Sequence, residues 1–134
     1  MSVRIVPVAL AFAVLASTAC LGIRDLAALQ QGLSASLHRT NITVRVNEGT
    51  TLEVQFTNDA AAPLPDSARA AFARSAAEFV RDNYPSYWHL DRVDVVFTTV
   101  TGSAGVTVTQ SDPPYRFATR DLGVRVVPPR APTP

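Results

Sequence analysis

Residues 41–57 read Asn-Ile-Thr-Val-Arg-Val-Asn-Glu-Gly-Thr-Thr-Leu-Glu-Val-Gln-Phe-Thr and decide the fold of this chain. Apolar residues alternate with polar ones on both sides of a short turn, as is typical of strands that bury one face. The alternating apolar residues are Ile42, Val44, Val46, Leu52, Val54 and Phe56. Residues 47–50 supply the turn, in which Gly49 can adopt a positive φ angle. The stretch predicts an antiparallel β-hairpin, whose first strand could begin earlier because residues 33–37 also alternate.

A helix is predicted after this hairpin, over residues 65–83. Apolar side chains recur there at three- and four-residue intervals, which places them on one face of a helix. These side chains are Leu64, Ala68, Phe72, Ala76, Phe79 and Val80. Pro65 suits the first helical turn, and Pro85 follows the last one. The residues that we expect to be deeply buried are Phe72, Phe79, Val44, Val54 and Val95.

Two further alternating runs follow the helix. Residues 92–100 carry apolar side chains on both faces, as a central strand does. Residues 106–109 alternate back across a Gly-containing turn at residues 101–105. Weaker strand signals occur at residues 115–117 and 122–127. We therefore expect a second antiparallel hairpin, followed by one or two short edge segments.

The predicted order of elements is β-β-α-β-β, and the fold class is α+β. Because each hairpin is local, we expect a four-stranded antiparallel sheet with one helix packed on one face, the simplest two-layer arrangement. The other face of the sheet would be polar. This domain would span residues 32–127, and the Pro-rich residues 128–134 would form an extended, disordered tail.

The N-terminus has the composition of an export signal. Arg4 precedes an apolar run at residues 5–15, and the small residues that follow end at Cys20, the only cysteine. A basic start, a short apolar core and a small-residue end are the features of a secretory signal peptide. The run is shorter than the ~20 apolar residues that span a bilayer. The stretch resembles the signal peptide of bacterial lipoproteins, with residues 17–20 in the place of the lipobox.

That resemblance implies cleavage between Ala19 and Cys20 and acylation of Cys20. Residues 1–19 would be the signal peptide and residues 20–31 a lipidated tether, so that the chain would contact the membrane through its N-terminal lipid. Leu21 after the cysteine favours the outer membrane, with the domain facing the periplasm or the cell surface. Two other interpretations stay open. One is ordinary secretion of a soluble binding protein, and the other is an anchor that is not cleaved.

The charge balance argues against two classes of partner. The chain has 12 basic residues, all of them arginine, and 11 acidic ones, so its formal net charge is +1. Nucleic-acid binding requires a concentrated basic surface, and polybasic attachment to lipid headgroups requires a similar cluster. We therefore expect no nucleic-acid partner and no attachment to membranes through basic side chains.

No motif for a cofactor, a metal ion or catalysis stands out. His38 and His89 lack the spacing of metal ligands, and Cys20 would be acylated, so we expect no metal site and no cofactor. Ser86, His89 and Asp91 lie close in sequence, but a catalytic triad is defined by geometry, and no G-x-S-x-G motif surrounds the serine. A small envelope hydrolase is the alternative to a non-catalytic domain.

Two surfaces are candidates for binding. Residues 84–90 concentrate aromatic side chains, among them Tyr87 and Trp88, which either contact a partner or seal the end of the helix against the sheet. The predicted polar face of the sheet carries Arg45 and Gln55. The function that these features favour is non-catalytic binding of an envelope protein, or a place in an envelope assembly.

Overall fold

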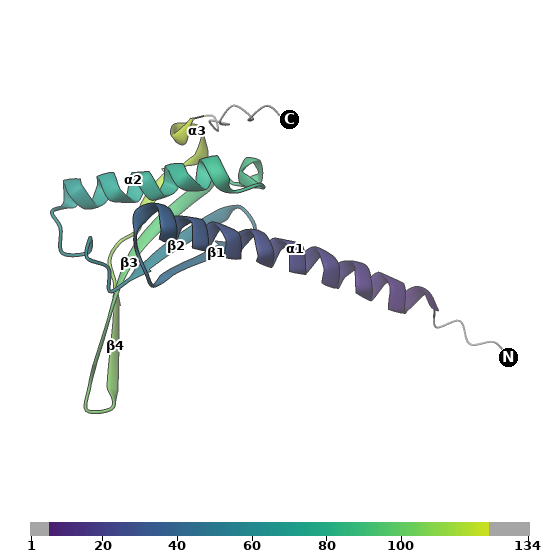
Figure 1. Ribbon diagram of the computed structural model, residues 1–134, viewed down its shortest axis with the longest axis horizontal. Helices are drawn as coiled ribbons and strands as arrows, with labels where there is room; N and C mark the ends of the chain where they lie inside the picture. Colours follow the sequence, from purple (N-terminus) through teal and green to yellow (C-terminus); the bar gives the residue numbers. More distant parts are fainter. Residues whose placement is uncertain (1–5, 124–134) are drawn as a thin grey trace, which may run out of the picture.

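The computed structural model of this chain describes residues 6–123, with side chains from residue 22 onward (Figure 1). Its elements are α1 (Val6–Leu37), β1 (Ile42–Asn47), β2 (Thr51–Thr57), α2 (Asp66–Asn83), the short 3₁₀ helix η1 (Tyr87–His89), β3 (Arg92–Ser103), β4 (Val106–Ser111), β5 (Tyr115–Ala118) and α3 (Thr119–Leu122). The predicted α+β class is confirmed. Both predicted hairpins are present, and α2 lies between them in the sequence.

The described strands form one mixed five-stranded sheet, so the predicted four-stranded antiparallel sheet is wrong in its details. The strand order is β1-β2-β3-β4, and β5 also pairs with β3. Strands within each hairpin are antiparallel, but β2 and β3 run parallel, with Val54 beside Val95. Helix α2 is the reason. It carries the chain back along the sheet, so that β3 begins at the same end as β2 and completes a β-α-β unit.

Strand β5 and helix α3 follow β4. β5 pairs antiparallel with the first part of β3, which agrees with the short edge segment predicted at residues 115–117. The weak strand signal at residues 122–127 is not a strand at its first residue, because Leu122 is the last residue of α3. The rest of that segment and the predicted tail lie outside the described residues, which end at 123.

Helix α1 lies beside α2 on the same face of the sheet, and its C-terminal part contributes to the core (Figure 1). Leu29 and Leu33 are 3% and 0% exposed. The idea that the first strand begins as early as residue 33 is therefore wrong. Leu33 and Leu37 fit the period of a strand, but they are also four residues apart and so share one face of a helix, which Leu29 extends.

Small side chains form the face of α2 that meets the sheet. The buried residues of this helix are Ala73, Ala76, Ala77 and Val80. Phe72 and Phe79 flank this face and are half-buried, not deeply buried as predicted. Phe72 packs edge-on against Phe56, with ring centroids 5.1 Å apart, and the ring of Phe79 lies against Gly32 of α1. The three valines expected in the core are all buried: Val44, Val54 and Val95.

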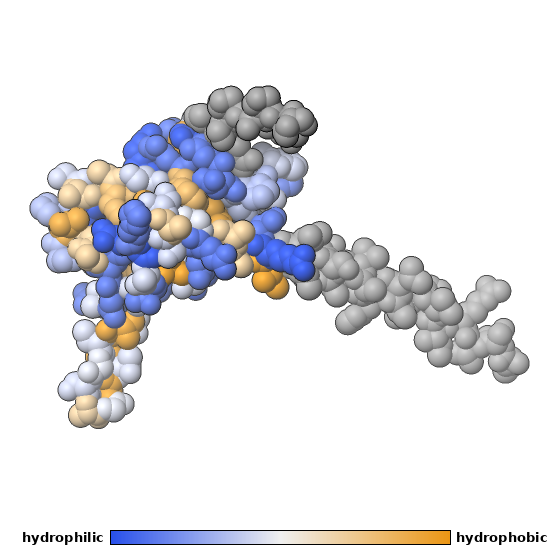
Figure 2. Space-filling model, in the orientation of Figure 1, coloured by the Kyte–Doolittle hydropathy of each residue, from blue (hydrophilic) through white to orange (hydrophobic). Residues whose placement is uncertain are grey.

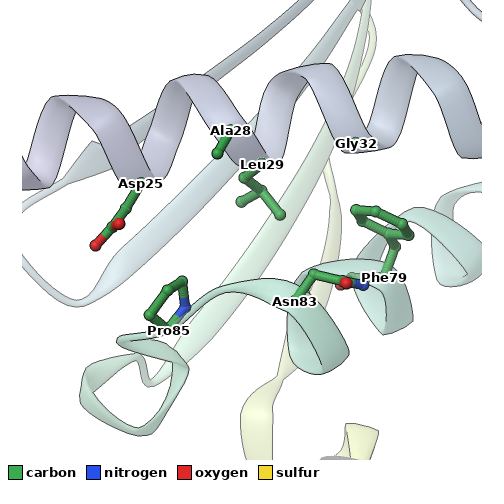
Figure 3. Close-up of a pocket in the computed structure, with 7 residues that line it drawn as sticks. All are labelled: Asp25, Ala28, Leu29, Gly32, Phe79, Asn83 and Pro85. Carbon is green, nitrogen blue, oxygen red and sulfur yellow. The ribbon is translucent and has the colours of Figure 1, made fainter. Parts of the chain in front are cut away.

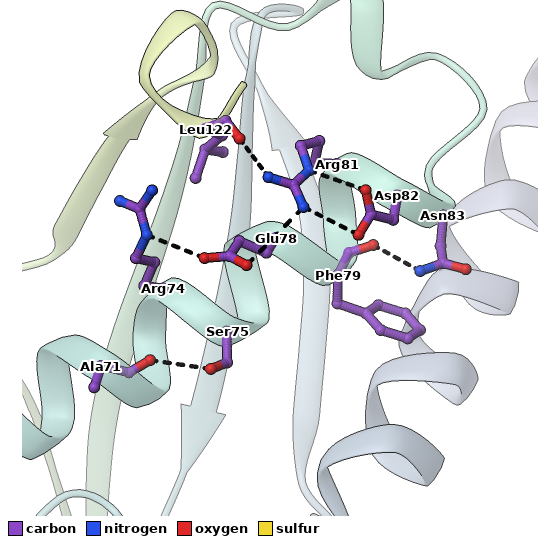
Figure 4. A network of polar contacts seen from close by, with 9 residues as sticks. All are labelled: Ala71, Arg74, Ser75, Glu78, Phe79, Arg81, Asp82, Asn83 and Leu122. Carbon is purple, nitrogen blue, oxygen red and sulfur yellow. Dashed lines mark hydrogen bonds and ion pairs between the residues drawn. The ribbon is translucent and has the colours of Figure 1, made fainter. Parts of the chain in front are cut away.

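A polar network on the outer side of α2 ties this helix to α3 (Figure 4). Arg81 donates one hydrogen bond to the carbonyl oxygen of Leu122 and another, of 2.9 Å, to the carboxylate of Asp82. The hydrogen bond to Asp82 is the largest contribution to the raised pKa of Arg81. One turn earlier, Arg74 pairs with Glu78 at 3.0 Å. The hydrogen bond from Arg81 to Leu122 holds the last described helix against α2, and the other two pairs lie within α2 itself.

Candidate functional site

Strand β3 leaves the body of the domain beyond Thr98, together with β4. In the described structure β2 pairs with β3 only as far as Thr98, and the rest of β3 pairs with β4. Figure 1 shows this hairpin projecting from the sheet, far from the place where α1 leaves the domain. We call residues 99–111 the hairpin arm. All six residues of β4 are exposed, so the hairpin arm presents both faces to solvent.

A two-residue turn forms the tip of the hairpin arm. Ser103 lies beside Val106 in the β3–β4 register, and the two residues between them, Ala104 and Gly105, have φ angles of 51° and 81°. Two consecutive positive φ angles give a turn whose twist matches that of the flanking strands. The turn is shorter than the predicted one at residues 101–105, because β3 continues as far as Ser103.

The hairpin arm carries no charged side chain. Between Asp94 and Asp112 the sequence is uncharged and rich in Val and Thr. Val106 and Val108 of β4 are 64% and 57% exposed, and Figure 2 shows hydrophobic, orange surface on the projecting arm. Natural proteins usually protect an exposed edge strand with charged residues, with Pro or with a covering element. In the described structure, the six residues of β4 include no charged residue and no Pro, and no element covers them. An edge of this kind can accept another strand.

The opposite edge of the hairpin arm, along β3, is closed at its base by Asn58. This residue follows β2, has a φ angle of 51°, and donates its backbone N–H to the carbonyl oxygen of Thr98 at 2.8 Å. Its side-chain amide accepts a 2.8 Å hydrogen bond from the backbone N–H of Val100 and donates a 3.3 Å one to the carbonyl oxygen of Val100. The amide thus takes the place of a neighbouring strand, and β4 keeps the longer open edge.

Contacts with α2 fix the base of the hairpin arm. The guanidinium of Arg69 donates to the carboxylate of Asp112 at 3.1 Å, and the backbone N–H of Asp112 donates to the carbonyl oxygen of Phe97 at 3.0 Å. The hydroxyl of Tyr115 donates to Asp66 at 2.6 Å. This hydrogen bond is the main cause of the raised pKa of Tyr115. The start of α2 therefore contacts the residues that directly follow the hairpin arm.

The predicted polar face lies on the side of the sheet away from α1 and α2. Arg45 on β1 pairs with Glu53 on β2 at 2.6 Å, and Arg92 pairs with Asp94 within β3 at 2.7 Å. The side-chain amide of Gln55 makes a long hydrogen bond within its own strand. Because these charges pair with one another, they are less available to the charged groups of a partner.

The aromatic residues that follow α2 divide into packed and exposed ones. Tyr84 is buried, and Tyr87 donates a 3.0 Å hydrogen bond from its hydroxyl to the carbonyl oxygen of Thr119. Burial raises the pKa of both phenols. Trp88 is 76% exposed, and its ring lies on that of His89 with centroids 3.4 Å apart. Tyr84 and Tyr87 seal the end of α2, whereas Trp88 presents its ring to solvent.

The structure does not assemble the residues considered for catalysis or metal binding. The backbone N–H of His89 donates to the carbonyl oxygen of Ser86 at 3.0 Å, and that of Asp91 donates to Thr50 at 2.8 Å. In the described structure no hydrogen bond joins the side chains of Ser86, His89 and Asp91. Nor do three or more His, Cys, Asp or Glu side chains lie together as a metal ion would require, among the residues described.

A small groove separates α1 from α2 (Figure 3). Leu29 and Phe79 line its apolar part, Asn83 lies between Phe79 and Pro85, and Asp25 and Pro85 lie towards its other end. Its volume is about 180 Å³. Pockets for small molecules usually measure about 300–1,000 Å³. The groove is therefore too small to enclose a drug-sized ligand.

The residues of the predicted lipid anchor lie within α1. Ala19 and Cys20 are part of this helix, and their side chains precede the first one that the structure describes. In the described part of the chain, no helix has the length and apolar character needed to cross a membrane. Acylation of Cys20 stays a prediction.

No family model, curated protein or solved structure matches this chain. The function has to be inferred from its own residues. The sequence pattern identified the strands of the hairpin arm but not their departure from the sheet. Two signals point to it in retrospect: the run that begins at residue 92 continues well past the length of its neighbour at residues 51–57, and its outer part carries no charge.

Proposed function

We propose that this chain is a lipoprotein of the bacterial cell envelope whose domain binds another protein without catalysis. Ala19 is then the last residue of the signal peptide, and Cys20 becomes the acylated N-terminus. Two or more acyl chains hold a protein stably on a membrane, and the resemblance favours the outer membrane. The exposed, uncharged edge of β4 is the observation that carries the binding function.

The edge of β4 suits the addition of a strand. An added strand would pair with the outward-facing backbone N–H and C=O groups of β4, and main-chain hydrogen bonds supply affinity in this mode of binding. Its side chains would meet Val106 and Val108 on one face and Thr107 and Thr109 on the other, because successive residues of a strand point to opposite faces. Pro113 follows β4 and ends the edge, since proline has no N–H to donate.

The occupant that we propose is an extended, uncharged segment of a partner protein, rich in β-branched residues. The hairpin arm has no charge with which an acidic or basic segment could pair, so a charged segment would lose hydration without compensation. β-branched side chains pack well across neighbouring strands. The polar face with Arg45 and Gln55 is the weaker candidate, because Arg45 already pairs with Glu53.

A photo-crosslinking amino acid at Val108, in the full chain expressed in its native host, tests this function. Thr43 is the matched control position, since it is exposed on β1 at the other end of the strand order. We expect an adduct with a different protein at Val108 and none at Thr43, and we expect Thr109→Lys to abolish it by placing a charge on the edge. The adduct should map to an extended, uncharged segment of the partner.

Two results would contradict strand addition by a partner at β4. The first is an adduct that forms equally at Val108 and Thr43, which would indicate non-specific contact. The second is an adduct that contains two copies of this chain and no other protein, which would make the arm a self-association surface.

A further inference from the structure

Residues 20–31, predicted as the lipidated tether, lie within α1, and the later part of this helix is docked on the domain. α1 is continuous from Val6 to Leu37, and Leu29 within it is 3% exposed. An α-helix rises about 1.5 Å per residue, so Leu29 lies only about 13 Å along the axis from Cys20. A lipid on Cys20 would therefore hold the end of the domain close to the bilayer surface, because a helix and not a flexible linker joins the two.

Two large apolar side chains are exposed at this end of the domain. Ile23, on the first turn of α1 after Cys20, is 66% exposed, and Trp88 in η1 is 76% exposed. Asp25 and Pro85 line the same groove, which brings the start of the docked part of α1 close to the turn that holds Trp88. Figure 3 shows this turn next to Pro85, on the side of Asp25 and away from Gly32.

The position of Trp88 is held firmly by its neighbours. The hydroxyl of Tyr87 is bonded to the carbonyl oxygen of Thr119, and Leu90 is 5% exposed. The ring of Trp88 has one aromatic contact in the described structure, with His89. An indole on a turn whose neighbours are packed, and exposed over most of its own surface, is suited to an external contact, since the backbone that carries it is already ordered.

We infer that Trp88 and Ile23 rest in the interfacial layer of the bilayer that holds Cys20, so that the domain lies directly on the membrane. This inference rests on the proposed acylation. Indole rings concentrate at the headgroup level, where the apolar ring leaves water and the N–H stays hydrated. Arg24, exposed between Ile23 and Asp25, lies at the same level, where it can meet anionic headgroups. The hairpin arm then lies at the end of the domain far from this contact, open to a partner (Figure 1).

Trp88 is the only tryptophan in the chain, so its fluorescence reports on this contact alone. The acylated mature chain is reconstituted into vesicles of phosphatidylethanolamine and phosphatidylglycerol, with and without bromine on the lipid acyl chains near the headgroup. We expect the brominated lipid to quench Trp88 emission, because an indole at the headgroup level lies within reach of bromine atoms near the headgroup. Ile23→Ser should weaken this quenching, because it removes the second apolar contact.

The matched control moves the indole to the other end of the domain. In Trp88→Phe combined with Val108→Trp, the new indole replaces a side chain that is 57% exposed on the hairpin arm. Brominated lipid should leave its emission unchanged, while aqueous iodide should quench it.

Flotation of the vesicles on a density gradient separates the two possible failures. A chain that floats with its vesicles while brominated lipid leaves Trp88 unquenched would overturn the membrane contact and leave the proposed anchoring intact. Equal quenching of the indole at position 108 would also overturn it. A mature chain that does not float would refute the anchoring, and the membrane contact with it.

Discussion

Replacing Leu33 with Ala tests whether the C-terminal part of α1 belongs to the folded core. Leu33 is 0% exposed and packs with the core side chains. Removing its three outer carbon atoms forfeits about 2.4 kcal/mol of transfer free energy, at about 0.8 kcal/mol for each buried carbon. The cavity that remains adds to this loss, so we expect the free energy of unfolding to fall by about 3 kcal/mol. The higher helix propensity of Ala offsets only a few tenths of a kcal/mol.

Urea unfolding of the full chain in a non-ionic detergent, followed by circular dichroism, measures this loss. With a slope of about 1.5 kcal/mol per M, the midpoint for Leu33→Ala should move down by about 2 M. Gln31→Ala is the matched control, because Gln31 is exposed on the same helix and a surface change of this kind stays within about 0.5 kcal/mol. Equal midpoints for Leu33→Ala and Gln31→Ala would refute the docking of α1.

Two further predictions concern the base of the hairpin arm. Asn58→Gly keeps the positive φ angle but removes both side-chain hydrogen bonds to Val100. The free energy of unfolding should fall by about 1–2 kcal/mol, and hydrogen exchange of the Val100 backbone N–H should accelerate. Unchanged exchange would show that the side chain of Asn58 does not close the edge. The hydrogen bond to Asp66 raises the pKa of Tyr115 above its ordinary value of 10.0, so its stabilisation is complete below that value and is lost as the pH rises through the higher folded pKa. As the pH rises from about 9 to about 11, the urea midpoint should therefore fall less steeply in Tyr115→Phe than in the wild type. Identical slopes of midpoint against pH would contradict a stabilising hydrogen bond between Tyr115 and Asp66.

Hydrophobic periodicity was enough to predict the local elements. The alternation through Val44 and Val54 located the first hairpin, and the three- and four-residue spacing located α2 within a residue. The relation between the hairpins could not be derived from periodicity alone, because it depends on the direction in which α2 returns the chain. That connection makes β3 parallel to β2, with Val54 beside Val95. In the sequence, only the succession of a strand, a helix and a strand indicates such a parallel pair.

The remaining differences come from patterns that fit two structures. The spacing of Leu33 and Leu37 fits a strand and a helix equally well. Only their packing with the rest of the core favours the helix. Phe72 lies on the apolar side of α2, but the residues of this helix that are fully buried are small ones and Val80, and Phe72 stays half-buried beside them. At the candidate site, adjacent Tyr87 and Trp88 were predicted as one group, and the tight η1 turn sends one ring into the domain and the other into solvent.

The central claim is that Cys20 is the acylated N-terminus of the mature chain. Mass spectrometry of the N-terminal peptide, taken from the chain purified separately out of the host's membrane and soluble fractions, tests it most directly. We predict a peptide that begins at Cys20 and carries acyl groups, and for Cys20→Ala a precursor that keeps residues 1–19. A mature chain that begins at any other residue, or that begins at an unmodified Cys20 and stays in the soluble fraction, would contradict the claim.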